Sequence, residues 1–117
     1  MSNTICHIEF DVTDIARSQS FFEALFGWSF RAFGDMVVFA AGDDHIGGMT
    51  KVDTVKAGDS PSVWFDVADL DEKLATAAKL GAKTLSEKNM LPGVGFTAQV
   101  ADPDGNPIGL VQFVKSD

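Results

Sequence analysis

A short polar series near the start of the chain has residue types suited to acid–base chemistry. His7, Glu9 and Asp11 alternate with apolar residues over positions 4–12. Successive side chains of a strand point to opposite faces, so these three share one face. Histidine changes charge near neutral pH, which makes His7 a candidate acid or base. Glu9 or Asp11 would fix its tautomer or bind a cationic ligand. The alternative is that His7 only forms structural hydrogen bonds.

A second polar and aromatic series lies at positions 62–67. Ser62, Trp64 and Asp66 alternate there with apolar residues. Trp64, and with it Phe39, would stack on a planar ligand, although aromatic side chains in a small domain also serve packing. The catalytic residues we predict are His7 and Glu9. The same two residues, with Phe39 and Trp64, are predicted to contact a ligand.

These two series belong to an internal repeat. The six residues Phe10–Ile15 match Phe65–Leu70, 55 positions later, in sequence and in being followed by a helical pattern. Near the end of each half, Ile46-Gly47 matches Ile108-Gly109. The chain is therefore predicted to contain two copies of one module. We expect a single domain over 1–117, with module one at 1–51, a linker at 52–61 and module two at 62–117.

Each copy is expected to form a strand, a helix and three further strands. Asp14 or Thr13 would cap the first helix, and Gly27 would end it. Asp69 would cap the second helix, which Gly81 would end. Met90–Phe96 would be either a mobile loop at the mouth of a cleft or a simple connection. The expected strands are 4–12, 28–33, 36–41, 46–50, 62–67, 82–87, 96–101 and 107–114.

Composition restricts the class of function. The formal net charge is −8, and the nine basic residues are scattered, which argues against nucleic acid because a phosphate backbone requires clustered Lys and Arg. No apolar stretch approaches the roughly 20 residues of a membrane span. The single cysteine allows no intrachain disulfide, and the first residues do not resemble a signal peptide. We expect a cytoplasmic protein that binds neither membrane nor nucleic acid.

The beginning and the end of the sequence resemble one known superfamily. His7-Ile-Glu-Phe-Asp-Val-Thr-Asp14, with the later Phe26-Gly27-Trp28, looks like the opening of the vicinal oxygen chelate superfamily. Asp102-Pro-Asp-Gly-Asn-Pro-Ile-Gly-Leu110 looks like its closing turn and last strand. The superfamily includes glyoxalase I, bleomycin-resistance proteins and extradiol dioxygenases. Gly47-Gly48-Met49 and Pro92-Gly-Val-Gly95 resemble its glyoxalase-related branch.

The resemblance implies an α+β fold in which two βαβββ modules form an incomplete eight-stranded barrel. Metal-dependent members hold a divalent ion with side chains on the first and last strands of each module. His7 fits one of these positions, whereas Ser62, Gly47 (or its neighbour Gly48) and Gly109 occupy the others. Glycine offers no ligand and serine a poor one. We therefore expect no metal and no cofactor, with Gly47 and Gly109 leaving room for the ligand.

Two functions remain open at this point. The first is metal-independent binding of a small molecule, as in proteins that resemble bleomycin-resistance proteins. The second is a lyase, isomerase or dioxygenase-type enzyme that uses His7 as acid, base or metal ligand. The resemblance also implies a homodimer.

Overall fold

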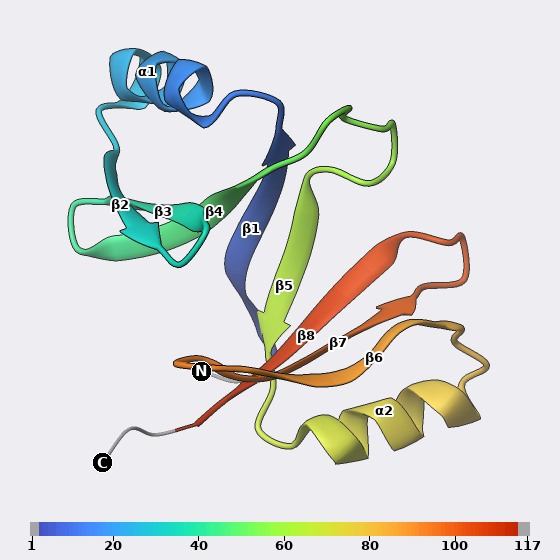
Figure 1. Ribbon diagram of the computed structural model, residues 1–117. Coiled ribbons are helices and arrows are strands. Elements are labelled where there is room, and N and C mark those ends of the chain that lie inside the picture. The colour runs from blue at the N-terminus through green and yellow to red at the C-terminus, as the bar shows by residue number, and fades with distance from the viewer. Residues whose placement is uncertain (1–2, 115–117) are drawn as a thin grey trace. The chain divides into compact units, whose positions relative to one another are not determined.

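The computed structural model describes residues 3–114, which form two compact units. The first unit comprises residues 6–62, and the second comprises residues 3–5 and 63–114. Each unit holds one helix and most or all of four strands (Figure 1). The prediction of a single domain with a linker at 52–61 stays a prediction, although no helix or strand forms over those ten residues.

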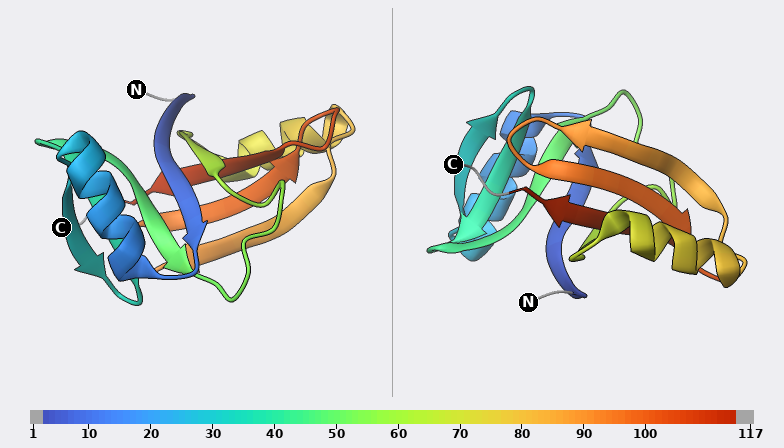
Figure 2. Two further views of the ribbon diagram at one scale, coloured as in Figure 1. Left: turned by 90° about the horizontal axis from the view of Figure 1, so that it is seen from above. Right: turned by 90° about the horizontal axis from the view of Figure 1, so that it is seen from below.

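The first unit has the predicted β-α-β-β-β order. Its strands lie in the order β2-β3-β4-β1, with β1 parallel to β4 and the other pairs antiparallel. The helix α1 lies on one face of this sheet (Figures 1 and 2). The elements are β1 (Thr4–Val12), α1 (Ile15–Phe26), β2 (Ser29–Phe33), β3 (Met36–Ala41) and β4 (Asp44–Lys51).

The second unit repeats this arrangement. Its strand order is β5-β8-β7-β6, again with the first and last strands of the module parallel, and α2 packs against β7 and β8 (Figure 2). The strands β2 and β6 each pair along one side only among the described residues, so the sheet does not close into a barrel. The elements are β5 (Ser62–Asp66), α2 (Leu70–Lys79), β6 (Thr84–Leu91), β7 (Gly95–Ala101) and β8 (Pro107–Phe113).

Both helices begin at a repeated aspartate. Asp14 accepts a hydrogen bond from the backbone N–H of Arg17 at 3.0 Å, and Asp69 accepts one from Glu72 at 3.1 Å. Such caps satisfy amide groups that have no partner within the helix. Gly27 ends α1 with φ of 71°, a left-handed conformation that glycine adopts without strain. The predicted caps and the predicted end of α1 are confirmed.

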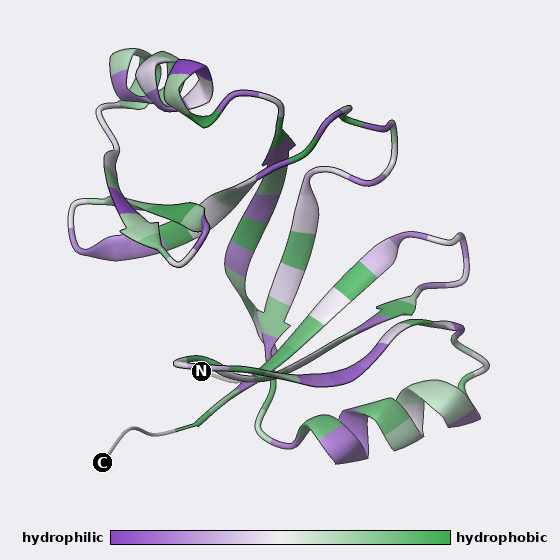
Figure 3. Ribbon diagram, in the orientation of Figure 1, coloured by the Kyte–Doolittle hydropathy of each residue, from purple (hydrophilic) through white to green (hydrophobic). Residues whose placement is uncertain are grey.

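Each unit has its own hydrophobic core on the helix-facing side of its sheet. Strand alternation produces this division, visible as bands on β1 and β5 (Figure 3). The most deeply buried side chains of the first unit are Phe39 and Met49, at 1% and 0% exposure. In the second unit Leu70 is fully buried. The other buried members of the two clusters are Val12 in the first unit and Val67, Ala98, Val100 and Leu110 in the second.

Of the two alternatives for Met90–Phe96, the structure shows the simple connection. The strand predicted over 82–87 is displaced along the chain, because β6 continues to Leu91 and a tight turn leads directly into β7 at Gly95. Every residue of β6 is exposed, so its sequence lacks the apolar alternation that marks a half-buried strand. On α1, Leu25 and Phe26 are 58% and 54% exposed.

Candidate functional site

The polar series of β1 lies on the face of the first sheet opposite α1. Phe10 and Val12 pack in the core under the helix, and alternation therefore turns His7 and Glu9 to the other face. The two side chains are only 21% and 17% exposed, and His7 Nε2 lies 2.6 Å from Glu9 Oε1. His7 and Glu9 are therefore hydrogen-bonded, as both the catalytic and the structural interpretation of His7 allowed, whereas Asp11, the other residue expected to fix its tautomer, forms no hydrogen bond with the ring.

Two residues of β4 extend this pair into a chain of hydrogen bonds. The hydroxyl of Thr50 donates to Glu9 Oε2 at 2.6 Å, and His45 Nε2 lies 2.8 Å from His7 Nδ1. The planes of the two imidazole rings differ by 21°, with centroids 5.0 Å apart. The order along this series of hydrogen bonds is Thr50, Glu9, His7, His45. We refer to these four residues as the histidine relay.

A β-bulge brings His45 to the relay. Phe39 pairs with Gly47, but the next residue, Ala40, pairs with His45, so that Ile46 is an extra residue in β4. Strict alternation would place His45 on the same face as Gly47, toward α1. The extra residue reverses this, and bulges commonly redirect side chains near functional sites. His45 was missed in the sequence because alternation alone gave no reason to place it beside His7.

Electrostatics keep His45 largely neutral near neutral pH. Partial desolvation of the ring lowers the pKa of His45 below 6.5, repulsion from His7 and Arg31 lowers it further, and Glu9 acts in the opposite direction. A neutral imidazole has one nitrogen that can accept a proton. The relay therefore ends in a solvent-exposed group with the properties of a base.

Not all of the residues that were predicted to contact a ligand lie on the same face as His7. Phe39 faces α1, where its ring stacks on Trp28 with centroids 4.9 Å apart, because its place in β3 puts it on the core side. Gly47 pairs with Ile8 on that same side. Its neighbour Gly48 pairs with Glu9, so Gly48 rather than Gly47 lies on the relay face.

In the second unit the predicted contacts are Trp64 and Gly109, which pair across β5 and β8. A Cβ added to Gly109 would lie 2.8 Å from Trp64 Cε2 and closer still to two other ring atoms. The space beside Gly109 is thus filled by the indole ring. Whether Trp64 and Gly109 contact a ligand stays a prediction.

The β4 position at which the resemblance implies a metal ligand is occupied by Gly47 or Gly48, and neither leaves room for a larger side chain. A Cβ on Gly47 would collide with the Ile8 carbonyl group, and one on Gly48 would lie 3.0 Å from Glu9 Oε1 and 2.7 Å from Met36 Cε. Neither glycine supplies a donor atom, and neighbouring atoms occupy the space that a side chain would need. Within residues 3–114, no three His, Cys, Asp or Glu side chains are grouped so that they could hold a metal ion.

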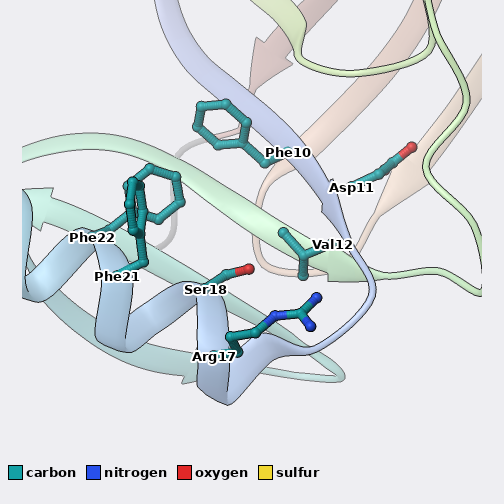
Figure 4. Close-up of a pocket in the computed structure, with 7 residues that line it drawn as sticks. All are labelled: Phe10, Asp11, Val12, Arg17, Ser18, Phe21 and Phe22. Atoms are coloured by element: carbon teal, nitrogen blue, oxygen red, sulfur yellow. The ribbon is translucent and has the colours of Figure 1, made fainter.

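A pocket of about 290 Å³ lies elsewhere in the first unit, between α1 and the end of β1 (Figure 4). Two of its polar groups are already paired: Arg17 Nη2 donates to Thr13 at 2.8 Å, and the Asp11 amide donates to Ser60 at 2.9 Å. None of the four relay residues lines this pocket, and the candidate site that we assign to the relay face is separate from it. The pocket is lined by Phe10, Asp11, Val12, Arg17, Ser18, Phe21 and Phe22.

Comparison with known proteins agrees with the fold and the resemblance. The family model of the glyoxalase-like domain matches residues 7–111, and the chain belongs to this family. No curated protein matches the sequence. The family is part of the predicted superfamily, so that prediction is confirmed.

Solved structures show the same fold at low identity. A glyoxalase/bleomycin resistance protein/dioxygenase superfamily member from Vibrio splendidus 12B01 is 17% identical, with a TM-score of 0.71 over 93% of this chain and 99% of that one. A variant of homoprotocatechuate 2,3-dioxygenase from Brevibacterium fuscum is 22% identical, with a TM-score of 0.72 over 97% of this chain. The match covers 34% of the dioxygenase, so this chain spans about a third of that enzyme.

Neither helix of the described residues has the length and apolar character needed to cross a membrane.

Proposed function

We propose that this protein binds a small molecule on the relay face of the first unit, without the metal ion of its metal-dependent relatives. The observation that carries the proposal is the unbroken series of three short hydrogen bonds from Thr50 to His45. Each side chain of the series has at least one fixed partner, and the last ring is exposed. A few polar groups held in place in this way can fix the orientation of a bound ligand.

Ligand screening by thermal stability tests this proposal. A ligand that binds the folded chain raises the melting temperature, by an amount that corresponds to about 2.7 kcal/mol at a hundredfold excess over Kd. The wild-type chain and His7→Gln would be screened against one metabolite collection. A ligand that stabilises the wild type and fails to stabilise His7→Gln supports the proposal. A ligand that stabilises both equally places the site elsewhere.

Acid–base catalysis is the second candidate function, and the pairing of His7 with Glu9 at 2.6 Å favours it. A carboxylate that fixes the tautomer of a histidine is the arrangement by which many enzymes prepare a general base. A lyase or isomerase reaction would need no further group for proton transfer. Turnover that is lost in Glu9→Gln while the ligand still stabilises this variant would distinguish catalysis from binding alone.

An ion-dependent reaction has a separate test. Metal analysis of protein purified without chelators, and melting scans with Zn²⁺, Mn²⁺ and Ni²⁺, would show any tightly held ion. The proposed metal-independent function requires that fewer than about one bound ion is found per ten protein chains. It also requires that none of the three ions raises the melting temperature.

We further propose a cytoplasmic homodimer. Three large apolar side chains of α1 are more than half exposed, namely Phe21, Leu25 and Phe26. Burial of this surface against a second copy would remove apolar area from water. Sedimentation velocity of the wild type and of Leu25→Glu would test the dimer, which the charged variant should dissociate.

A further inference from the structure

The exposed end of the relay differs chemically from its interior. Both nitrogens of His7 are engaged, Nε2 with Glu9 at 2.6 Å and Nδ1 with His45 at 2.8 Å. His45 uses only Nε2, and its Nδ1 has no hydrogen-bond partner among residues 3–114. A small molecule on this face therefore meets His45 first, with His7 behind it.

The relay has two proton arrangements that preserve every hydrogen bond. With Glu9 ionised, His7 Nε2–H donates to Glu9, and His45 Nε2–H donates to His7 Nδ1, which leaves His45 Nδ1 as a free acceptor. If Nδ1 gains a proton, the proton on His45 Nε2 passes to His7. The positive charge then lies on His7, directly beside the Glu9 carboxylate.

From this geometry we propose that His45 is the proton acceptor for the bound molecule, with His7 and Glu9 as positioning residues behind it. The proposal rests on the proposed function and assigns a role within the same site. One proton leaves an O–H or C–H bond of the ligand and enters His45 Nδ1, and the electron pair of that bond stays on the ligand as an anion. The proton that shifts to His7 gives that ring a positive charge, which the negative charge of the Glu9 carboxylate compensates.

Arg31 indicates the class of ligand. On the sheet, Arg31 pairs with Val38, Val38 with Gly48, and Gly48 with Glu9, so this row crosses all four strands on the relay face. Between Arg31 and Glu9 the row contains only a valine and a glycine, and the methyl group of Met36 lies beside the glycine. Arg31 forms no ion pair with any described residue. Its charge lies close enough to act on the ring of His45. A guanidinium near a base suits a small, weakly acidic molecule whose conjugate base is an anion.

Other charges near the ring are few. β1 contributes His7 and Glu9, β2 contributes Arg31, and β3 carries no titratable side chain. On β4 itself the titratable residues besides His45 are Asp44, which is adjacent, and Lys51, at the far end of the strand, and Asp43 lies in the turn before β4. The sequence contains only these two histidines, so the reactivity of each ring can be measured separately.

Reactivity toward diethyl pyrocarbonate tests the relay without a known ligand. The reagent acylates a neutral imidazole nitrogen, and mass spectrometry of peptides assigns the label to His7 or His45. We expect His45 to react at least about tenfold faster than His7, whose nitrogens are both engaged. Glu9→Gln should slow the labelling of His45 several-fold, because the carboxylate no longer fixes the tautomer of His7 that accepts the Nε2 proton of His45.

Asp11→Asn is the matched control, since Asp11 is the next carboxylate on the same strand face and does not contact the ring. It should change the labelling rate of His45 by less than about twofold. If Glu9→Gln does not fold, Thr50→Val replaces it, because that change removes only the hydrogen bond to Glu9 Oε2. Equal labelling of His45 in the wild type and in the folded relay variant would overturn the proposal.

Proton transfer itself is tested with 4-nitrophenol, whose anion is yellow. Addition of the wild-type protein at about pH 6 should increase the absorbance of the phenolate, since the relay takes the proton and Arg31 stabilises the anion. His45→Gln should abolish the increase, and Arg31→Gln should weaken it several-fold, whereas Asp11→Asn should retain it. No increase with wild-type protein at about millimolar concentration, or an undiminished increase with His45→Gln, would overturn the assignment.

The two proposals fail in different ways. If a metabolite from the screen binds through His7 but labelling and nitrophenol ionisation do not depend on His45, only the proton-acceptor role is lost. If labelling and ionisation behave as expected but no metabolite stabilises the chain, the relay stands and the proposed binding function is lost.

Discussion

Substitution of Gly47 by alanine tests whether the glycines of β4 provide open space or close packing. The added Cβ would lie 2.8 Å from the carbonyl carbon of Ile8 and closer to its oxygen, whereas 3.4–4 Å is ordinary contact. These are backbone atoms of the paired strand β1, so no side chain can turn aside. Overpacking of this kind costs about 1–3 kcal/mol or more. We expect about 3 kcal/mol, a large fraction of the stability of a small domain.

The effect can be measured in the first unit separately. The chain has two tryptophans, Trp28 in the first unit and Trp64 in the second, so a Trp64→Phe background makes Trp28 fluorescence the reporter. At about 4 °C per kcal/mol, Gly47→Ala should lower the melting temperature by about 12 °C. In the full chain, Gly109→Ala should cost less, because the ring of Trp64 can rotate away. A Gly47→Ala protein that melts within about 2 °C of its parent would refute the close packing.

Three further changes have defined outcomes. Asp14→Ala removes the cap on the Arg17 amide and should cost about 1 kcal/mol in denaturant unfolding, whereas Asp14→Asn should cost little. Phe39→Ala should lower the free energy of unfolding by about 3–5 kcal/mol, since the ring is almost fully buried. A much smaller loss of stability would contradict the place of this ring in the core. Folding lowers the pKa of His45 below its ordinary value of 6.5. Between the folded pKa and pH 6.5 the unfolded chain therefore binds more protons than the folded chain. The free energy of unfolding should thus decrease as the pH falls from 6.5 toward the folded pKa. His45→Gln should remove part of this pH dependence, as measured by unfolding in urea at several pH values.

The repeat and the alternation of polar and apolar residues were sufficient to predict the fold. The matching blocks beginning at Phe10 and Phe65 predicted two modules with the same order of elements, which the structure confirms. The helix caps were predictable because an aspartate before a helical pattern has a local physical role. β6 was less predictable, since an exposed edge strand needs no apolar face.

The site was predictable only where alternation continues without interruption. His7 and Glu9 lie on one strand, so their spacing alone placed them together. His45 comes from another strand, and an extra residue determines its direction, which neither composition nor spacing reveals. Phe39 was assigned to the ligand by its chemical type, but its face depends on the register of β3 against β4. Long-range register is the information that a single sequence lacks.

The bulge at Ile46 makes the chemistry of this face depend on the register of β4 against β3. If the same residues paired without the bulge, Ile46 would lie on the relay face and the imidazole of His45 would turn toward α1, while His7 and Glu9 kept their pairing. One local irregularity of the backbone thus decides whether the outer ring reaches His7, with every side chain of the series still present in the sequence. Among related chains with a histidine at this place, the pairing of the two strands is therefore a better guide to this arrangement than the presence of the histidine.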